Sequence, residues 1–108
     1  MDAKGAVAAL GALAQQSRLE VFRLLVRRGP VGLAAGEISE RVGVPPTTLS
    51  FHLAQLSRAG LVTSRREGRS ILYAADYGGM QGLMGFLTEN CCQEGGCGPL
   101  PAPKRRGK

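Results

Sequence analysis

Two short helical patterns separated by a five-residue break constrain the fold of this chain more than any other feature. The break, Val-Gly-Val-Pro-Pro, spans residues 42–46. A proline at position 46 fits the first turn of a new helix, whereas the glycine and the first proline end the preceding one. Residues 34–44 therefore predict one short helix, and residues 47–60 predict a second. Leucines at helical spacing mark the inner face of this second helix: Leu49, Leu53 and Leu56.

The pattern of side chains changes directly after Gly60. Residues 61–65 and 70–74 are rich in β-branched, aromatic and other apolar side chains, which is typical of short strands. Glu67-Gly68-Arg69 lies between them, and Gly68 can adopt the positive φ that a tight hairpin needs. A short helix, a turn, a second helix and a hairpin follow one another in the order of a helix-turn-helix with a wing.

Helical patterns also occupy residues 2–15, 18–28 and 77–90. The predicted fold class is thus mainly α (α+β), a winged helix-turn-helix over residues 1–90 with four helices, two strands and a last helix. Residues 91–108 are rich in glycine, proline and basic side chains and predict a flexible tail. Glycines weaken the last helix and a core of this size is marginal, so both features favour a homodimer.

Positive charge indicates a polyanionic partner. The net charge is +6, and between Arg41 and Arg69 there are five arginines against one glutamate, which is the electrostatic footprint of nucleic-acid binding. Phe51 either covers a thymine methyl group or packs on the protein. His52 lacks a companion histidine and therefore suits DNA better than a metal. Residues able to reach base edges or phosphates are Thr47, Thr48, Ser50, Phe51, His52, Gln55, Arg65, Arg66 and Arg69.

Other classes of function find little support in the sequence. It offers no nucleophile–base pair, phosphate-binding loop or paired catalytic carboxylates, so we expect no enzymatic activity. It contains no run of about 20 apolar residues, and its first residues make a poor signal peptide. We therefore expect a cytoplasmic protein that does not interact with membranes.

The stretch GEISERVGVPPTTLSFHLAQLSRAGLVTSRREGRSILY, residues 36–73, resembles the helix-turn-helix and wing of the ArsR family of metal-responsive bacterial repressors. The resemblance covers about residues 5–90. It implies a homodimer whose first and last helices form the interface. Such a dimer would bind an inverted repeat in double-stranded operator DNA until a metal or metalloid releases it. The residues expected to face the partner subunit are Leu10, Leu13, Met80, Leu83, Met84 and Leu87.

The expected sensing site departs from the commonest pattern of that family. The short helix before residue 46 lacks a Cys-x-Cys pair, and the last helix lacks histidine. The three cysteines instead lie at positions 91, 92 and 97. A disulfide between the neighbours Cys91 and Cys92 would be strained, whereas three thiolates suit a soft centre. Trivalent arsenic bonds three sulfurs in a pyramid, so we expect Cys91, Cys92 and Cys97 to bind arsenite, or antimonite as its analogue.

The expected function is a repressor of an arsenic-resistance operon that leaves its operator when trivalent arsenic binds. Several alternatives remain open at this point. Methylarsenite could use two of the thiols, and cadmium, lead or zinc could replace arsenic. A thiol-redox regulator could switch through a Cys92–Cys97 disulfide. A DNA-binding protein without any sensing role would show no response to an inducer.

Overall fold

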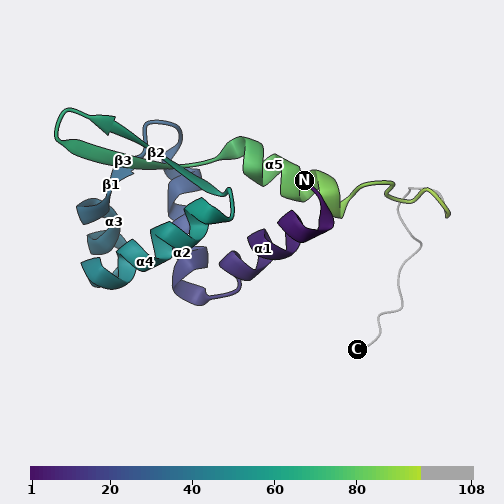
Figure 1. Ribbon diagram of the computed structural model, residues 1–108, viewed down its shortest axis with the longest axis horizontal. Helices are drawn as coiled ribbons and strands as arrows, with labels where there is room; N and C mark the ends of the chain where they lie inside the picture. The colour runs from purple at the N-terminus through teal and green to yellow at the C-terminus, as the bar shows by residue number, and fades with distance from the viewer. Residues whose placement is uncertain (96–108) are drawn as a thin grey trace.

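The computed structural model describes residues 1–95, which form five helices and one three-stranded antiparallel sheet (Figure 1). The predicted mainly α winged helix-turn-helix is confirmed, with one additional short strand. The wing lies at one end of this body, and the first and last helices lie side by side at the other. In chain order the elements are α1 (Ala3–Leu13), α2 (Gln16–Arg28), β1 (Leu33–Ala34), α3 (Ala35–Val42), α4 (Pro46–Arg58), β2 (Val62–Glu67), β3 (Ser70–Ala75) and α5 (Tyr77–Leu87).

The helix-turn-helix consists of α3 and α4 packed against α2. Gly43 ends α3 in the left-handed conformation, with φ of 71°, which glycine adopts without a steric penalty. The Ser39 carbonyl accepts hydrogen bonds from the amides of Gly43 and Val44, so the turn is tightly closed. Pro46 then begins α4, as the sequence indicated. The fully buried side chains around this unit include Val21, Leu25, Ile38, Leu49 and Leu56.

The sheet has the strand order β1-β3-β2. Strand β1 was missed in the sequence because two residues are too short to show an alternating pattern. Leu33 of β1 pairs with Tyr73 of β3. Gly32 precedes it with φ of 77°, and a Cβ there would lie 2.6 Å from the Tyr73 carbonyl oxygen, so the close approach of this loop to the sheet requires glycine.

Two helix boundaries differ from the sequence prediction. Helix α2 begins at Gln16 rather than at residue 18, because the Gln15 side chain caps the helix by accepting a hydrogen bond from the Arg18 amide. Helix α5 ends at Leu87, and residues 88–95 form turns. The glycine-rich composition of α5 explains its shortness, since each glycine lowers helix propensity.

A compact junction joins the end of α4 to the start of α5. Gly60 leaves α4 with φ of 80°. The Leu61 amide donates to the Leu56 carbonyl, and the Asp76 amide donates to the Leu61 carbonyl. The Asp76 carboxylate then caps α5 by accepting from the Gly79 amide. Two helices far apart in the sequence are therefore held together by consecutive hydrogen bonds.

Helix α1 packs on the rest of the protein through alanines. Ala6, Ala9 and Ala12 are buried, whereas Val7 and Leu10 are exposed. Small side chains let α1 pack closely on its neighbours, so the larger apolar residues point outward. Among residues 1–95, no helix has the length and hydropathy needed to span a membrane.

Candidate nucleic-acid interface

Helix α4 presents a polar surface that begins at its first turn. Thr47, Thr48 and Ser50 are exposed, as predicted, and Gln55 is half-buried. Phe51 is 55% exposed, so it is available for contact with a partner instead of packing in the core. The two threonines and the serine supply hydroxyl groups that both donate and accept hydrogen bonds, and they lie where a recognition helix enters a major groove.

His52 is not on this surface, so its predicted position on the exposed face was wrong. Its side chain is 6% exposed because it lies on the same inner face of α4 as the buried leucines. The Arg18 guanidinium donates to the Ala12 carbonyl at 2.7 Å and lies 3.3 Å from His52 Nδ1. Since arginine can only donate, Nδ1 must accept, and His52 is the neutral tautomer. Burial lowers the pKa of His52 below its ordinary 6.5, and the charge of Arg18 lowers it further.

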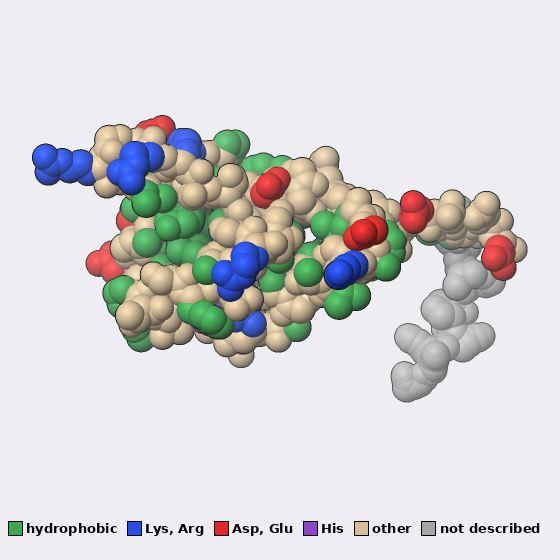
Figure 2. All heavy atoms as spheres, in the orientation of Figure 1, with side chains coloured by type: hydrophobic (Ala, Val, Ile, Leu, Met, Phe, Trp, Pro, Cys, Tyr) green, Lys and Arg blue, Asp and Glu red, His purple; other side chains and the backbone are tan. Residues whose placement is uncertain are grey.

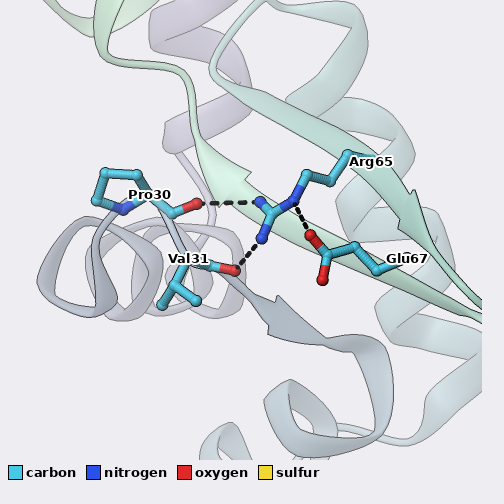
Figure 3. A network of polar contacts seen from close by, with 4 residues as sticks. All are labelled: Pro30, Val31, Arg65 and Glu67. Atoms are coloured by element: carbon cyan, nitrogen blue, oxygen red, sulfur yellow. Dashed lines mark hydrogen bonds and ion pairs between the residues drawn. The ribbon is translucent and has the colours of Figure 1, made fainter.

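The wing carries the predicted arginines in two different environments. Arg66 and Arg69 lie near the hairpin tip, are exposed, and make no side-chain hydrogen bond or ion pair within residues 1–95. Arg65 is bound within the protein (Figure 3). Its guanidinium donates to the carbonyls of Pro30 and Val31 at 3.1 and 2.9 Å, and it pairs with Glu67 at 3.0 Å. Arg65 thus ties the wing to the loop before β1.

One exposed arginine on α4 was absent from the predicted contacts. Arg58 lies on the same stripe as Thr47, Phe51 and Ala54, because positions i, i+4, i+7 and i+11 share one helix face. Its side chain makes no hydrogen bond or ion pair in the part of the chain that the structure describes. If the helical spacing that begins at Thr47 is continued to the end of α4, it reaches Arg58. Figure 2 shows basic side chains on the wing and, separately, over the α4–α1 region of the same view.

Helices α1 and α5 lie at the end of the molecule away from the wing (Figure 1), and both carry exposed apolar side chains. Met84 and Leu87 are 58% and 57% exposed, and Leu10 is also exposed, as expected of residues that face a partner. Leu13 and Met80 are half-buried against the core. Leu83 was wrongly placed on this surface, because it is 6% exposed within a single protomer and packs into its core.

Two of the three cysteines lie in the turns that follow α5. Cys91 and Cys92 are exposed and their Sγ atoms are 3.3 Å apart. Cys92 has φ of 62° and Asn90 has φ of 59°, so the chain bends sharply on both sides of Cys91. No cluster of three or more histidine, cysteine or acidic side chains suited to a metal occurs within residues 1–95. Cys97, the third predicted ligand, lies outside the described residues.

Comparisons with known proteins agree with the winged helix-turn-helix fold. The profile of a family described as a helix-turn-helix domain matches residues 13–65. The chain is 33% identical over 88 residues to the transcriptional activator HlyU of Vibrio cholerae, covering 82% of this chain and 79% of HlyU. It is 38% identical over 63 residues to a putative arsenical resistance operon repressor ArsR of Halobacterium salinarum, covering 58% of this chain and 48% of that protein.

Solved structures give the same result. A structure of Vibrio cholerae HlyU matches with a TM-score of 0.66 and 32% identity, covering 86% of this chain and 100% of that one. The homodimeric winged helix-turn-helix DNA-binding domain of Mb0332 from Mycobacterium bovis, a possible ArsR-family regulator, matches with a TM-score of 0.65 and 27% identity, covering 82% of each chain. These relatives are transcriptional regulators rather than enzymes. The chain therefore belongs to the ArsR family of winged helix-turn-helix transcriptional regulators.

Proposed function

We propose that this protein is a dimeric repressor of an arsenic-resistance operon, which trivalent arsenic releases from its operator. The observation that carries the sensing half is the pair of exposed thiols directly after α5, with sulfurs 3.3 Å apart. The DNA-binding half rests on the exposed polar face of α4 and on the basic wing. Arg66 and Arg69 would contact phosphates or the minor groove, and Thr47, Thr48 and Ser50 would contact base edges.

The apolar surface of α1 and α5 supports the dimer. A helix with Met84 and Leu87 exposed would leave a large apolar area in water, which a second copy can cover. The two recognition helices of such a dimer would read two halves of an inverted repeat. His52 does not belong to the proposed contact set, since a buried side chain cannot reach a base edge.

Arsenite is the proposed inducer because the thiols form the soft ligand set. Cys97, as the third thiolate, would complete a pyramidal site in each subunit, and antimonite would bind in the same way. Since α5 ends three residues before Asn90, coordination would act on the turns after the helix and not on its last turn. Arsenite must bind the DNA-free form more tightly than the bound form, otherwise it releases nothing.

A second candidate function is a thiol-redox switch through a Cys92–Cys97 disulfide. The exposure of Cys92 on a sharply bent chain favours it, and so does the similarity to HlyU, one structure of which is described as reduced HlyU. The redox switch requires oxidation of two thiols to a disulfide, whereas the arsenite sensor does not. Arsenite acts on reduced thiols, whereas the disulfide forms only with an oxidant.

The test is operator release under a strong phosphine reductant that does not provide thiols. DNA selected by the protein from a random pool would be labelled, and its fluorescence anisotropy would be followed as arsenite is added. The proposal predicts release at about one arsenite per subunit, and Cys91→Ser should require much more arsenite. Release by an oxidant, with none by arsenite, would establish the redox function instead.

A further inference from the structure

We propose that the cleft between α1 and the end of α4 binds a phosphate of the DNA backbone, on the side of the recognition helix that faces the dimer centre. This inference rests on the proposed DNA-binding function and extends it to residues outside the helix-turn-helix and wing. The cleft has a volume of about 280 Å³ and contains Arg18, Gln55 and Arg58 together with small residues of α1. Two guanidinium groups and an amide line it, and none of the lining residues among residues 1–95 carries a carboxylate.

Arg18 is the fixed part of this site. Its Nε donates to the Ala12 carbonyl and its Nη1 donates to His52 Nδ1, so two bonds hold the guanidinium plane. Among residues 1–95, Nη2 makes no hydrogen bond. Every buried polar side-chain atom in that range does have a hydrogen-bond partner. Nη2 is therefore accessible to solvent, and Arg18 lines the cleft. A fixed guanidinium with accessible N–H groups is suited to binding a phosphate oxygen.

Arg58 is the exposed part of the site. It lies on the stripe of α4 that begins at Thr47, eleven residues earlier, which is about 16 Å along the helix axis. The major groove is about 8.5 Å deep and about 12 Å wide. When the first turn of α4 is in the groove, the backbone of a residue about 16 Å behind it is outside the groove, and only a long side chain can extend from there to a phosphate. Arg58 thus reaches a phosphate and not a base.

The position of the cleft favours DNA over a separate anion as the occupant. Residues of α1 line one side of it, and the same helix carries the exposed Leu10 of the proposed dimer interface. In such a dimer, DNA that passes from one recognition helix to the other would cross this region. His52 has a role in this arrangement as a positioning residue, because its Nδ1 holds Arg18 toward the cleft from inside the protein.

The test measures the salt dependence of DNA binding for Arg58→Gln and for Arg23→Gln as a matched control. Arg23 is also an exposed arginine, and it lines a separate groove between α2 and α3. Each lost phosphate contact lowers the slope of log K against log salt by about 0.9, so a dimer of Arg58→Gln should lose about 1.8 and bind roughly ten- to a hundredfold more weakly at 0.1 M salt. Arg23→Gln should retain the slope of the parent.

A second measurement uses duplexes with a neutral methylphosphonate at single backbone positions. One position between the half-sites should weaken the parent but have no further effect on Arg58→Gln, because the contact is already lost. His52→Gln, whose carbonyl oxygen can accept from Arg18, should bind nearly as the parent, whereas His52→Leu should behave like Arg58→Gln. An unchanged slope for Arg58→Gln, or additive effects at every backbone position, would overturn the phosphate site.

The same experiments separate this inference from the proposed function. If the parent binds no inverted repeat, the proposed function fails, and the slope on non-specific duplex still reports whether Arg58 contacts a phosphate. If free protein binds inorganic phosphate at millimolar concentration while Arg58→Gln keeps the parent slope on DNA, the cleft is a site for a small anion and the inference is wrong.

Discussion

Replacing Gly79 with alanine should destabilise the protein, whereas the same replacement at Gly85 in the same helix should not. A Cβ at Gly79 would lie 1.8 Å from the Gly60 carbonyl oxygen, at the junction between α4 and α5. Weak C–H···O contacts have carbon–oxygen distances of about 3.3 Å or more, so Gly79→Ala requires a shift of about 1.5 Å to reach an ordinary contact. The obstacle is backbone and not a flexible side chain, so the helix or the turn must move.

The cost follows from the size of that shift. Overpacking a core typically destabilises a protein by about 1–3 kcal/mol, and a backbone obstacle places Gly79→Ala at the upper end, near 3 kcal/mol. For a domain of this size, that loss lowers Tm by roughly 12–24 °C. Gly85→Ala is the matched control, because the same helix gains the same methyl group and nothing lies within 4 Å of the new Cβ. Alanine has the higher helix propensity, so this variant should gain about 0.5–1 kcal/mol.

The assay is thermal unfolding by circular dichroism, with all variants at one protein concentration because the Tm of a dimer depends on concentration. We expect the two glycine variants to move in opposite directions from the parent. Operator affinity should also fall for Gly79→Ala, because Gly60 directly follows the recognition helix. If Gly79→Ala melted within about 2 °C of the parent, or if Gly85→Ala fell equally far, the reasoning about a closed α4–α5 junction would be refuted.

Three further predictions concern the wing, the buried histidine and the dimer. Glu67 pairs with Arg65, so Glu67→Ala should weaken operator binding if the pair holds Arg65 in place. If Glu67 only repels the DNA phosphates, the same change should tighten binding, and an anisotropy titration distinguishes the two outcomes. The lowered pKa of His52 means that the unfolded chain binds the proton more readily than the folded one, so stability should fall as pH drops below about 6.5. Between pH 7.5 and 5.5 the Tm of the parent should therefore fall more than the Tm of His52→Gln. Met84→Glu or Leu87→Glu should give folded monomers in analytical ultracentrifugation, because both side chains lie outside the protomer's core; a stable dimer would locate the interface elsewhere.

The order of elements was predictable because local signals agreed with one another. Pro46, Gly60 and Gly68 each marked a boundary through a backbone restriction that acts within one or two residues. Strand β1 gave no such signal, since it exists only through pairing with β3. A strand of two residues depends on a distant partner, and no local pattern can indicate that partner.

Several side-chain positions were not predictable because periodicity does not fix the exact inner face of a helix. His52 lies between leucines on α4, and its burial depends on Arg18, 34 residues away in the sequence. Leu83 and Met84 are neighbours of similar size, yet the packing of α1 against α5 buries only Leu83. Arg65 resembles Arg66 in the sequence, and the carbonyls of Pro30 and Val31 distinguish them in space.

The candidate thiol site was predictable by residue type, because the chain's three cysteines all lie within seven positions. The arrangement of two of them became clear from the turns after α5, where the left-handed conformations of Asn90 and Cys92 bend the chain around Cys91. Such conformations are uncommon outside glycine, and the sequence gives no sign of them.

Reciprocal linkage tests the central claim most directly. The arsenite affinity of the fully reduced protein should be measured by calorimetry twice, once without DNA and once with saturating operator. If arsenite weakens operator binding by a given factor, operator must weaken arsenite binding by the same factor. Our account predicts a weaker arsenite affinity in the presence of operator, typically by 5- to 150-fold. Equal affinities in the two titrations would contradict the claim that the thiols after α5 control DNA binding.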